Sequence, residues 1–229
     1  MPKVILMEPS TPGNIGAIAR AMKNFALTEL ILINPKCDHL SIEAQNRAKH
    51  AKDILKKAKV KTPTYLKRLP LLIATTAQLG SDYNLPRSHL TPNQLSKKIT
   101  KKHDYALLFG REGDGLTNEE IQQADIICHI PASPKYQTLN LSQAATILFY
   151  ELYQSSTNES SIDNITPASK QDLQLVQKHL TQVLNKLEFS TKEKKDTQKT
   201  AWKRIFAKAL LTRREAFAIH GFLKKLIKK

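Results

Sequence analysis

Five short apolar segments alternate with helical patterns through the first 150 residues, and this alternation limits the possible folds more than any other feature. The segments are residues 4–7, 30–33, 71–75, 105–109 and 126–130. Most of them are apolar throughout rather than at every second position, which is typical of strands covered on both faces of a sheet. Strand–helix alternation of this kind predicts an α/β fold with a mainly parallel sheet.

The stretches between these segments carry helix signals. Apolar residues recur at helical spacing over 15–22 and again over 44–55. Thr91, which a proline follows, and Thr117, which has Glu120 three residues later, match the patterns that begin helices. We therefore expect helices between the strands, as a parallel sheet requires.

The composition changes near residue 154. Residues 154–168 are mostly polar and turn-forming, which is typical of a linker. Residues 169–229 show three helical apolar stripes, the last beginning at a capping pair of Thr212 and Glu215. The chain is thus predicted to contain an α/β domain over 1–153, a linker over 154–168, and a small helical module over 169–229.

Positive charge is the strongest compositional signal, with a formal net charge of +16. Residues 199–229 hold ten basic residues and one acidic residue, whereas residues 154–198 hold six of each. Such a dense basic segment indicates a polyanionic partner, with RNA or DNA ahead of a membrane surface. The alternative is a solvated helix face without a partner.

Several classes of protein find no support. No apolar run is long enough for a membrane span and no signal-peptide pattern is present, so we expect a cytoplasmic protein. Cys37 and Cys128 are too few for a disulfide framework, and their neighbourhoods lack zinc-ligand spacing, so no metal is expected. The Gly-x-Ser-x-Gly turn of serine hydrolases is absent.

Three of the seven glycines lie in the segment GREGDG, residues 110–115, directly after a predicted strand. Loops at the carboxyl ends of parallel strands are where ligands bind in such sheets. The glycine spacing matches neither the dinucleotide fingerprint nor the P-loop, which disfavours a nucleotide-dependent oxidoreductase. A tight turn without a function remains an alternative at this point.

Two further loops run into predicted helices. After the first strand, a turn-rich segment over 8–16 leads to Arg20 and Lys23, which share a helix face that could hold a phosphate. An ordinary exposed arginine is the alternative. In the segment 136–142, Asn140 and Ser142 could either cap the following helix or make polar contacts in a site.

Together these loops resemble the three motifs of the SpoU/TrmH family of SPOUT methyltransferases. The matching segments are GNIGAIARAMKNF at 13–25, LLFGREGDGLTNEEI at 107–121 with HIP at 129–131, and YQTLNLSQAATILFYEL at 136–152. The likeness is to the TrmJ-type RNA ribose 2′-O-methyltransferases, whose C-terminal helical extension is similar in length to residues 155–229.

The resemblance implies an α/β domain with a deep trefoil knot, a rare exception to the rule that chains are unknotted. It implies S-adenosylmethionine as methyl donor and a homodimer in which one protomer lends residues to its partner's site. Arg20 matches the family's catalytic arginine, and Asn14, Glu112 and Ser142 match polar positions near the reacting centre. The implied cofactor contacts are Thr75, Thr76, Ala77, Gly110, Ile130, Thr138, Leu139 and Asn140.

The implied activity is 2′-O-methylation of tRNA at a pyrimidine, position 32, the first nucleotide of the anticodon loop. The basic residues expected to contact RNA are Lys23, Lys203, Arg204, Lys208, Arg213, Arg214, Lys224 and Lys225. Ribosomal RNA is an alternative substrate, and a non-catalytic RNA-binding or assembly protein is an alternative of another class. The module could instead serve mainly in dimerisation through Trp202 and Phe206.

Overall fold

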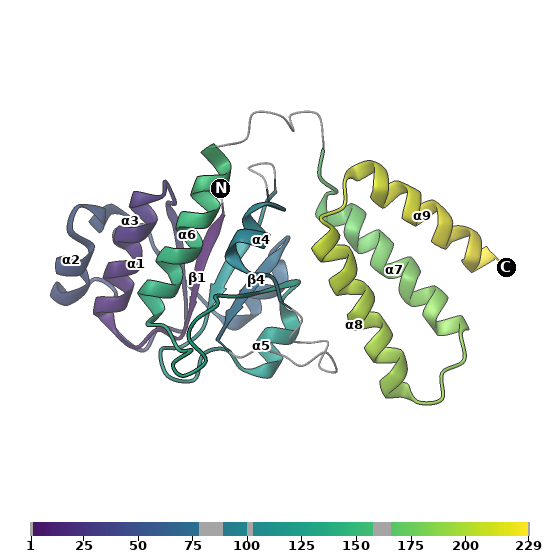
Figure 1. Ribbon diagram of the computed structural model, residues 1–229, viewed down its shortest axis with the longest axis horizontal. Helices are drawn as coiled ribbons and strands as arrows, with labels where there is room; N and C mark the ends of the chain where they lie inside the picture. The colour runs from purple at the N-terminus through teal and green to yellow at the C-terminus, as the bar shows by residue number, and fades with distance from the viewer. Residues whose placement is uncertain (1, 78–88, 100–102, 158–165, 229) are drawn as a thin grey trace.

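A six-stranded parallel sheet forms the centre of the computed structural model, which describes residues 2–77, 89–99, 103–157 and 166–228 (Figure 1). The strands lie in the order β3-β2-β1-β5-β4-β6, and every paired neighbour is parallel. Their bounds are β1 Lys3–Met7, β2 Glu29–Ile33, β3 Lys59–Lys61, β4 Leu72–Thr76, β5 Ala106–Phe109 and β6 Ile126–His129. The predicted α/β class is confirmed.

The five predicted strands are present, each to within one residue at either end. The edge strand β3 was not predicted, because its three residues are Lys59, Val60 and Lys61, all exposed, and they form no apolar run. Among the described strands, β3 pairs with β2 alone. Short, charged edge strands protect a sheet from pairing with other chains. Because such a strand lacks an apolar run, the search for apolar segments does not detect it.

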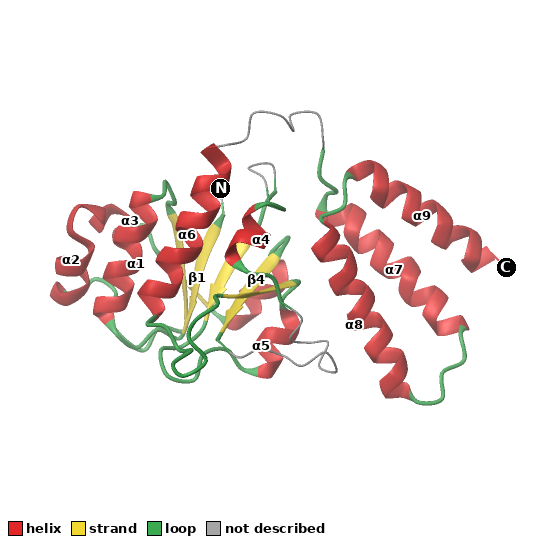
Figure 2. Cartoon of the chain, in the orientation of Figure 1, coloured by secondary structure: helices red, strands yellow, loops and turns green. Residues whose placement is uncertain are grey.

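The strands are buried on both faces, as their continuous apolar character predicts. Along β1, Val4 and Leu6 belong to one core cluster and Ile5 and Met7 to another. One face is covered by α1 (Pro12–Asn24), α3 (Lys52–Lys56), α4 (Pro92–Ser96) and α6 (Leu141–Thr157). The helix α2 (Ile42–Ala48) packs on α1 and lies at the edge of the molecule in Figure 2. The other face packs against η2 (Pro63–Arg68) and residues flanking α5 (Asn118–Gln123).

The helical pattern over 44–55 is interrupted. Its apolar members, Ala44, Ala48, Ala51 and Leu55, are all buried, so the periodicity identifies the correct face. However, α2 ends before Lys49, where φ is +52° and ψ is −115°, and a 3₁₀ turn, η1 (Lys49–Ala51), leads into α3. The predicted helical pattern is confirmed, but the apolar spacing does not reveal the break, because a change of backbone direction at a single residue leaves that spacing intact.

The three C-terminal helices form a module with its own small core. They are α7 (Lys170–Lys186), α8 (Lys192–Ala209) and α9 (Arg213–Lys228), and their shared core includes Val176, Leu180 and Leu223. The module attaches to the α/β domain through α8, since Ala207 belongs to the main core of the sheet. Figure 1 shows the module at the end of the molecule opposite α2.

Part of the predicted linker is helical, because α6 continues to Thr157. Residues 158–165 lie outside the described part of the chain. The module begins with an isolated bridge between Pro167 and Thr212, and the predicted cap is present, with Glu215 accepting hydrogen bonds from the backbone and side chain of Thr212. Within the described residues, no helix is both long and apolar enough to cross a bilayer.

Gly16 marks the closest approach between α1 and α2. A Cβ atom at this position would lie 2.1 Å from the carbonyl oxygen of Ala44, which is backbone and has no rotamer with which to avoid it. A Cβ atom at Gly221, in the middle of α9, would have no heavy atom within 4 Å, so this glycine offers a matched control.

We expect Gly16→Ala to lower the free energy of unfolding by about 1–3 kcal/mol, the usual cost of forcing an extra carbon into a packed interface. Gly221→Ala should raise it by up to about 1 kcal/mol, because alanine is the better helix former. Urea unfolding of both variants measures the two effects. A Gly16→Ala variant as stable as the wild type would contradict the close packing of α1 on α2.

Candidate functional site

The candidate site lies where the chain connections diverge at the carboxyl ends of the strands. From β1 the chain passes through α1 to β2 on one side, whereas from β5 it passes through α5 to β6 on the other. Since β1 and β5 are neighbours, the loops that follow them separate and leave room between them. Ligands in open parallel sheets bind at such a switch point.

A cavity opens beside these loops. It is lined by the end of β4, the loop 110–116, Ile130, residues 137–139 and Leu141. Seven of the eight predicted cofactor contacts line it, namely Thr75, Thr76, Ala77, Gly110, Ile130, Thr138 and Leu139. The eighth, Asn140, is not among the lining residues but binds the adjacent polar network described below.

The lining combines three threonine hydroxyls with apolar side chains. Ile130 and Leu139 supply apolar surface, and Leu116 adds more. The Thr75 hydroxyl donates to the carbonyl oxygen of Leu108 at 3.2 Å, which ties the end of β4 to β5. Such a wall suits a ligand with a flat apolar body and polar edges, which is the chemical character of a nucleoside.

The loop 110–115 is closed by its own backbone. Arg111 and Gly115 form an isolated antiparallel bridge, with N···O distances of 3.0 and 3.2 Å. A Cβ atom on Gly110 would lie 2.3 Å from the carbonyl carbon of Gly115, and Gly115 itself has φ +68°. Both positions therefore require glycine, one for space and one for conformation.

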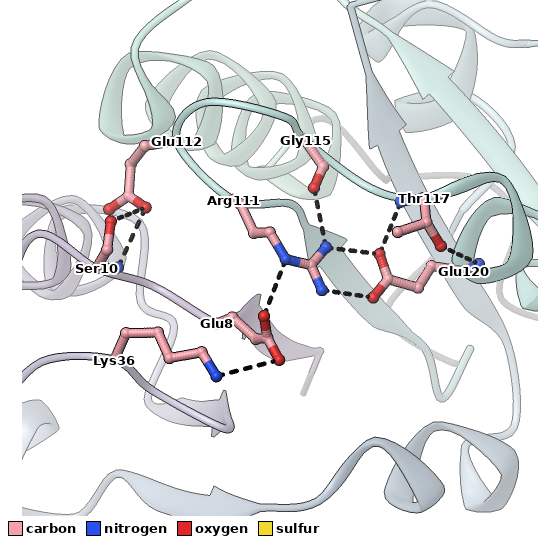
Figure 3. A network of polar contacts seen from close by, with 8 residues as sticks. All are labelled: Glu8, Ser10, Lys36, Arg111, Glu112, Gly115, Thr117 and Glu120. Carbon is pink, nitrogen blue, oxygen red and sulfur yellow. Dashed lines mark hydrogen bonds and ion pairs between the residues drawn. The ribbon is translucent and has the colours of Figure 1, made fainter.

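The Arg111 guanidinium holds this loop against two other elements (Figure 3). It donates to Glu8 at 3.1 Å, to both carboxylate oxygens of Glu120 at 3.0 Å, and to the carbonyl oxygen of Gly115 at 3.2 Å. Lys36 lies 3.6 Å from the Glu8 carboxylate. Hydrogen bonding to Glu120, and then to Glu8, raises the pKa of Arg111 above its ordinary value. No sequence signal indicated this network.

Glu112, the next residue, points to the opposite side of the loop and binds the segment after β1. Its carboxylate accepts from the backbone NH of Ser10 at 3.2 Å, the Ser10 hydroxyl at 3.0 Å, the Thr11 NH at 3.1 Å and the Asn14 side chain at 3.2 Å. Burial opposes ionisation of Glu112, but the hydrogen bonds from Asn14 and Ser10 outweigh it and lower the pKa of the carboxyl.

The same chain of hydrogen bonds continues into the third motif. The Asn140 amide donates to Asn14 at 3.2 Å, and its oxygen accepts from the backbone NH and hydroxyl of Ser142 at 2.9 and 2.7 Å. Four predicted polar residues, Glu112, Asn14, Asn140 and Ser142, thus form one connected network. This network joins the three motif segments, which are separated by up to 126 residues in sequence.

Arg20 does not share this network. It is exposed on α1 and lines a different depression, together with residues of α2, rather than the cavity beside the loop 110–115. Lys23 forms an ion pair with Asp53 at 2.8 Å and donates to the carbonyl oxygen of His50. The structure of a single chain therefore separates the predicted catalytic arginine from the predicted cofactor residues.

The predicted RNA-binding cations of the module fall into two groups. Arg204 is buried and donates to the carbonyl oxygen of Ile121 at 3.5 Å, and Lys203 lies 3.3 Å from the Asp125 carboxylate. Burial lowers the pKa of Lys208. These three residues lie on α8, which packs on the α/β domain. The exposed group lies on α9 and consists of Arg213, Arg214, Lys224 and Lys225.

Comparison with known proteins places these observations in context. The model of the SpoU rRNA Methylase family matches residues 1–150. A Methanocaldococcus jannaschii protein named tRNA (cytidine-2′-O-)-methyltransferase TrmJ is 36% identical over 228 residues, covering 98% of this chain and 99% of the relative. A Pseudomonas aeruginosa protein named tRNA (cytidine/uridine/adenosine-2′-O-)-methyltransferase TrmJ is 30% identical, covering 96% and 91%. The crystal structure of TrmJ from Z. mobilis ZM4 superposes with a TM-score of 0.69 at 28% identity, covering all of both chains.

Two glycines give a direct test of the cavity. We expect Gly110→Ala to weaken binding of S-adenosylmethionine, the cofactor that the motif resemblance implies, by at least about tenfold, because the new Cβ displaces backbone that lines the cavity. Gly221→Ala, on α9 and outside the lining of the cavity, should bind within about twofold of the wild type, since no heavy atom lies within 4 Å of its Cβ position. Isothermal titration calorimetry measures both, and equal affinities for the two variants would contradict this role of the loop.

Proposed function

We propose, from the premise that this chain belongs to the SpoU rRNA Methylase family, that it is an S-adenosylmethionine-dependent RNA ribose 2′-O-methyltransferase acting on tRNA. The observation that supports this best is the single hydrogen-bond network that joins the three motif segments beside a nucleoside-like cavity. Relatives named as tRNA methyltransferases match almost the whole chain, the helical module included, which favours tRNA over ribosomal RNA.

The cavity residues fit the methyl donor. Hydroxyls of Thr75, Thr76 and Thr138 and the backbone of loop 110–115 can bind polar edges, while Ile130 and Leu139 can contact a flat ring. When bound, S-adenosylmethionine supplies a methyl group carried on a positively charged sulfur. Methyl transfer to a hydroxyl oxygen makes this charge disappear, and apolar walls that exclude water lower the reorganisation the step requires.

Arg20 is proposed to act on the RNA rather than as a base. A guanidinium keeps its positive charge in proteins, so it can bind a flanking phosphate and stabilise a developing oxyanion, but it cannot readily accept a proton. The phosphate or water would then receive the proton from the ribose hydroxyl. Because Arg20 does not line its own chain's cavity, this role supports a homodimer in which the partner's cavity receives it.

An exposed apolar face on α6 also supports a dimer. Ile147, Tyr150 and Tyr153 are 37%, 48% and 42% exposed, and Phe25 at the end of α1 packs against both tyrosine rings. Contiguous apolar patches of this kind on a folded chain indicate an association surface.

Finer features implied by the resemblance complete the proposal. They are a deep trefoil knot around the donor, a cytoplasmic location, and a pyrimidine at tRNA position 32 as the target. Incubating the protein with total RNA and labelled S-adenosylmethionine, followed by mapping of ribose methylation, tests the activity. Label confined to ribosomal RNA would contradict the tRNA assignment. A chain that transfers no label and binds no donor would be a non-catalytic RNA-binding protein instead.

Arg20→Ala should reduce turnover by at least about a hundredfold while leaving the affinity for S-adenosylmethionine within a few-fold of the wild type, because it removes stabilisation of the reacting oxygen only. Arg68→Ala, an exposed arginine on the opposite face of the sheet, is the matched control and should retain wild-type turnover. Single-turnover methylation assays measure both variants. Near wild-type turnover in Arg20→Ala would refute the assignment.

The exposed cations of α9 should contribute to tRNA binding. Replacing Arg213 and Arg214 by glutamine should make the slope of log K against log salt less negative by about 1.5, as expected for the loss of two phosphate contacts. The control replaces Lys56 and Lys57, at the end of α3, in the same way and should leave the slope unchanged. Sedimentation of the α9 variant should still give the wild-type oligomer. A change of oligomeric state without a change of slope would favour the dimerisation role of the module.

A further inference from the structure

We propose that a groove between α1 and α2 is a second RNA contact, which binds backbone phosphates flanking the target nucleotide. Six residues line this α1–α2 groove: Arg20, Ile42, Glu43, Asn46, Arg47 and Lys49. The proposal rests on the proposed function, because the groove includes Arg20, and it assigns roles to Arg47, Lys49 and their neighbours on α2.

The groove gathers cations that nothing in the described chain neutralises. Arg20, Arg47 and Lys49 are exposed, and within the described residues none of the three side chains forms an ion pair. Nearby Lys23, by contrast, is paired with Asp53. Among the described lining residues, Glu43 is the one acidic side chain, so a positive excess remains. Converging unpaired cations in a concave surface attract anions and raise their local concentration.

The glycines of the first motif place Arg47 beside Arg20. A Cβ atom at Gly16 would lie 2.8 Å from Cβ of Arg47, and one at Gly13 would lie 3.8 Å from its Cγ. The aliphatic stem of Arg47 therefore packs across the first turns of α1. Gly16 and Arg20 are one helical turn apart on the same face of α1. The stem of Arg47 that packs against Gly16 therefore lies next to Arg20.

Lys49 adds an independent sign of function. Its backbone has φ +52° and ψ −115°, a combination that glycine adopts readily and other residues rarely. Leu210, which also follows a helix, has φ +46° and ψ +56°, the ordinary left-handed helix cap. Strained residues with side chains concentrate at functional sites. Here the unusual backbone conformation of Lys49 changes the direction of the chain at the end of α2 and places the lysine at the groove.

The remaining lining suits a nucleic acid better than a free anion. Ile42 is 79% exposed, which is unusual for its type, and Asn46 offers an amide on the same helix. Together they can contact a sugar or base next to a phosphate held by Arg47 and Lys49. Single-stranded RNA loops present backbone, sugar and unstacked base to a protein at once.

The test compares full-length R47Q with R68Q, which makes the same charge change on the opposite face of the sheet. R47Q should weaken tRNA binding about 5- to 10-fold and make the slope of log K against log salt less negative by about 0.7–0.9, the value for one phosphate. The affinity for S-adenosylmethionine should not change, and the loss should fall on KM for tRNA more than on kcat. R68Q should match the wild type in every measurement.

A second variant, K49G, separates charge from folding. It removes the cation and relieves the backbone, so its free energy of unfolding should equal or exceed that of the wild type. Its tRNA affinity should fall, and its slope of log K against log salt should become less negative, as for R47Q. If the wild-type chain methylates tRNA but R47Q and K49G both keep the wild-type slope of log K against log salt, the groove proposal alone would be wrong. A wild-type chain that methylates no RNA would overturn the proposed function instead.

Discussion

The carboxylate of Glu112 holds the site together. Its two oxygens accept from two backbone NH groups, a hydroxyl and an amide, all contributed by the segment 10–14 at the start of α1. Four donors fill the acceptor capacity of an ionised carboxylate, whereas a protonated carboxyl would lose part of it. The donors lower the pKa of Glu112 against the cost of burial, so the group that joins the loops after β1 and β5 stays charged at neutral pH. Arg111, its neighbour, anchors the same loop from the other side (Figure 3).

Sequence patterns predicted the sheet well because a buried strand needs a run of apolar residues, and that signal is local. These patterns did not indicate β3 or the helix break at Lys49, because both features are set by the backbone rather than by buried side chains. At β3 the pairing is made by backbone groups while Lys59 and Lys61 face solvent. At Lys49 the helix breaks while buried Ala48 and Ala51 keep their spacing. In both places the structure depends on backbone hydrogen bonds or dihedral angles, which the spacing of apolar side chains does not reveal.

The candidate site, too, was predictable only in part. Motif resemblance indicated Asn14, Glu112, Asn140 and Ser142, and the structure connects them. The resemblance could not indicate that Arg204 would be buried against the carbonyl oxygen of Ile121. A count of charges along a helix says how basic the helix is but not which of its cations are used to attach it. A buried guanidinium without partners is costly, so these contacts commit part of the basic excess of the module to its docking on the domain.

Several departures from local rules occur beside the candidate site and at the α1–α2 groove. Gly13 and Gly16 weaken α1 as helix formers, and Lys49 holds a backbone conformation suited to glycine. Glu8, with φ +42°, lies where Arg111 binds the end of β1. A sequence optimised for stability alone would remove each of these. Gly13 and Gly16 let α2 approach α1 closely, whereas Glu8 and Lys49 change the direction of the backbone. In the proposed function, both effects place charged side chains where the RNA would bind.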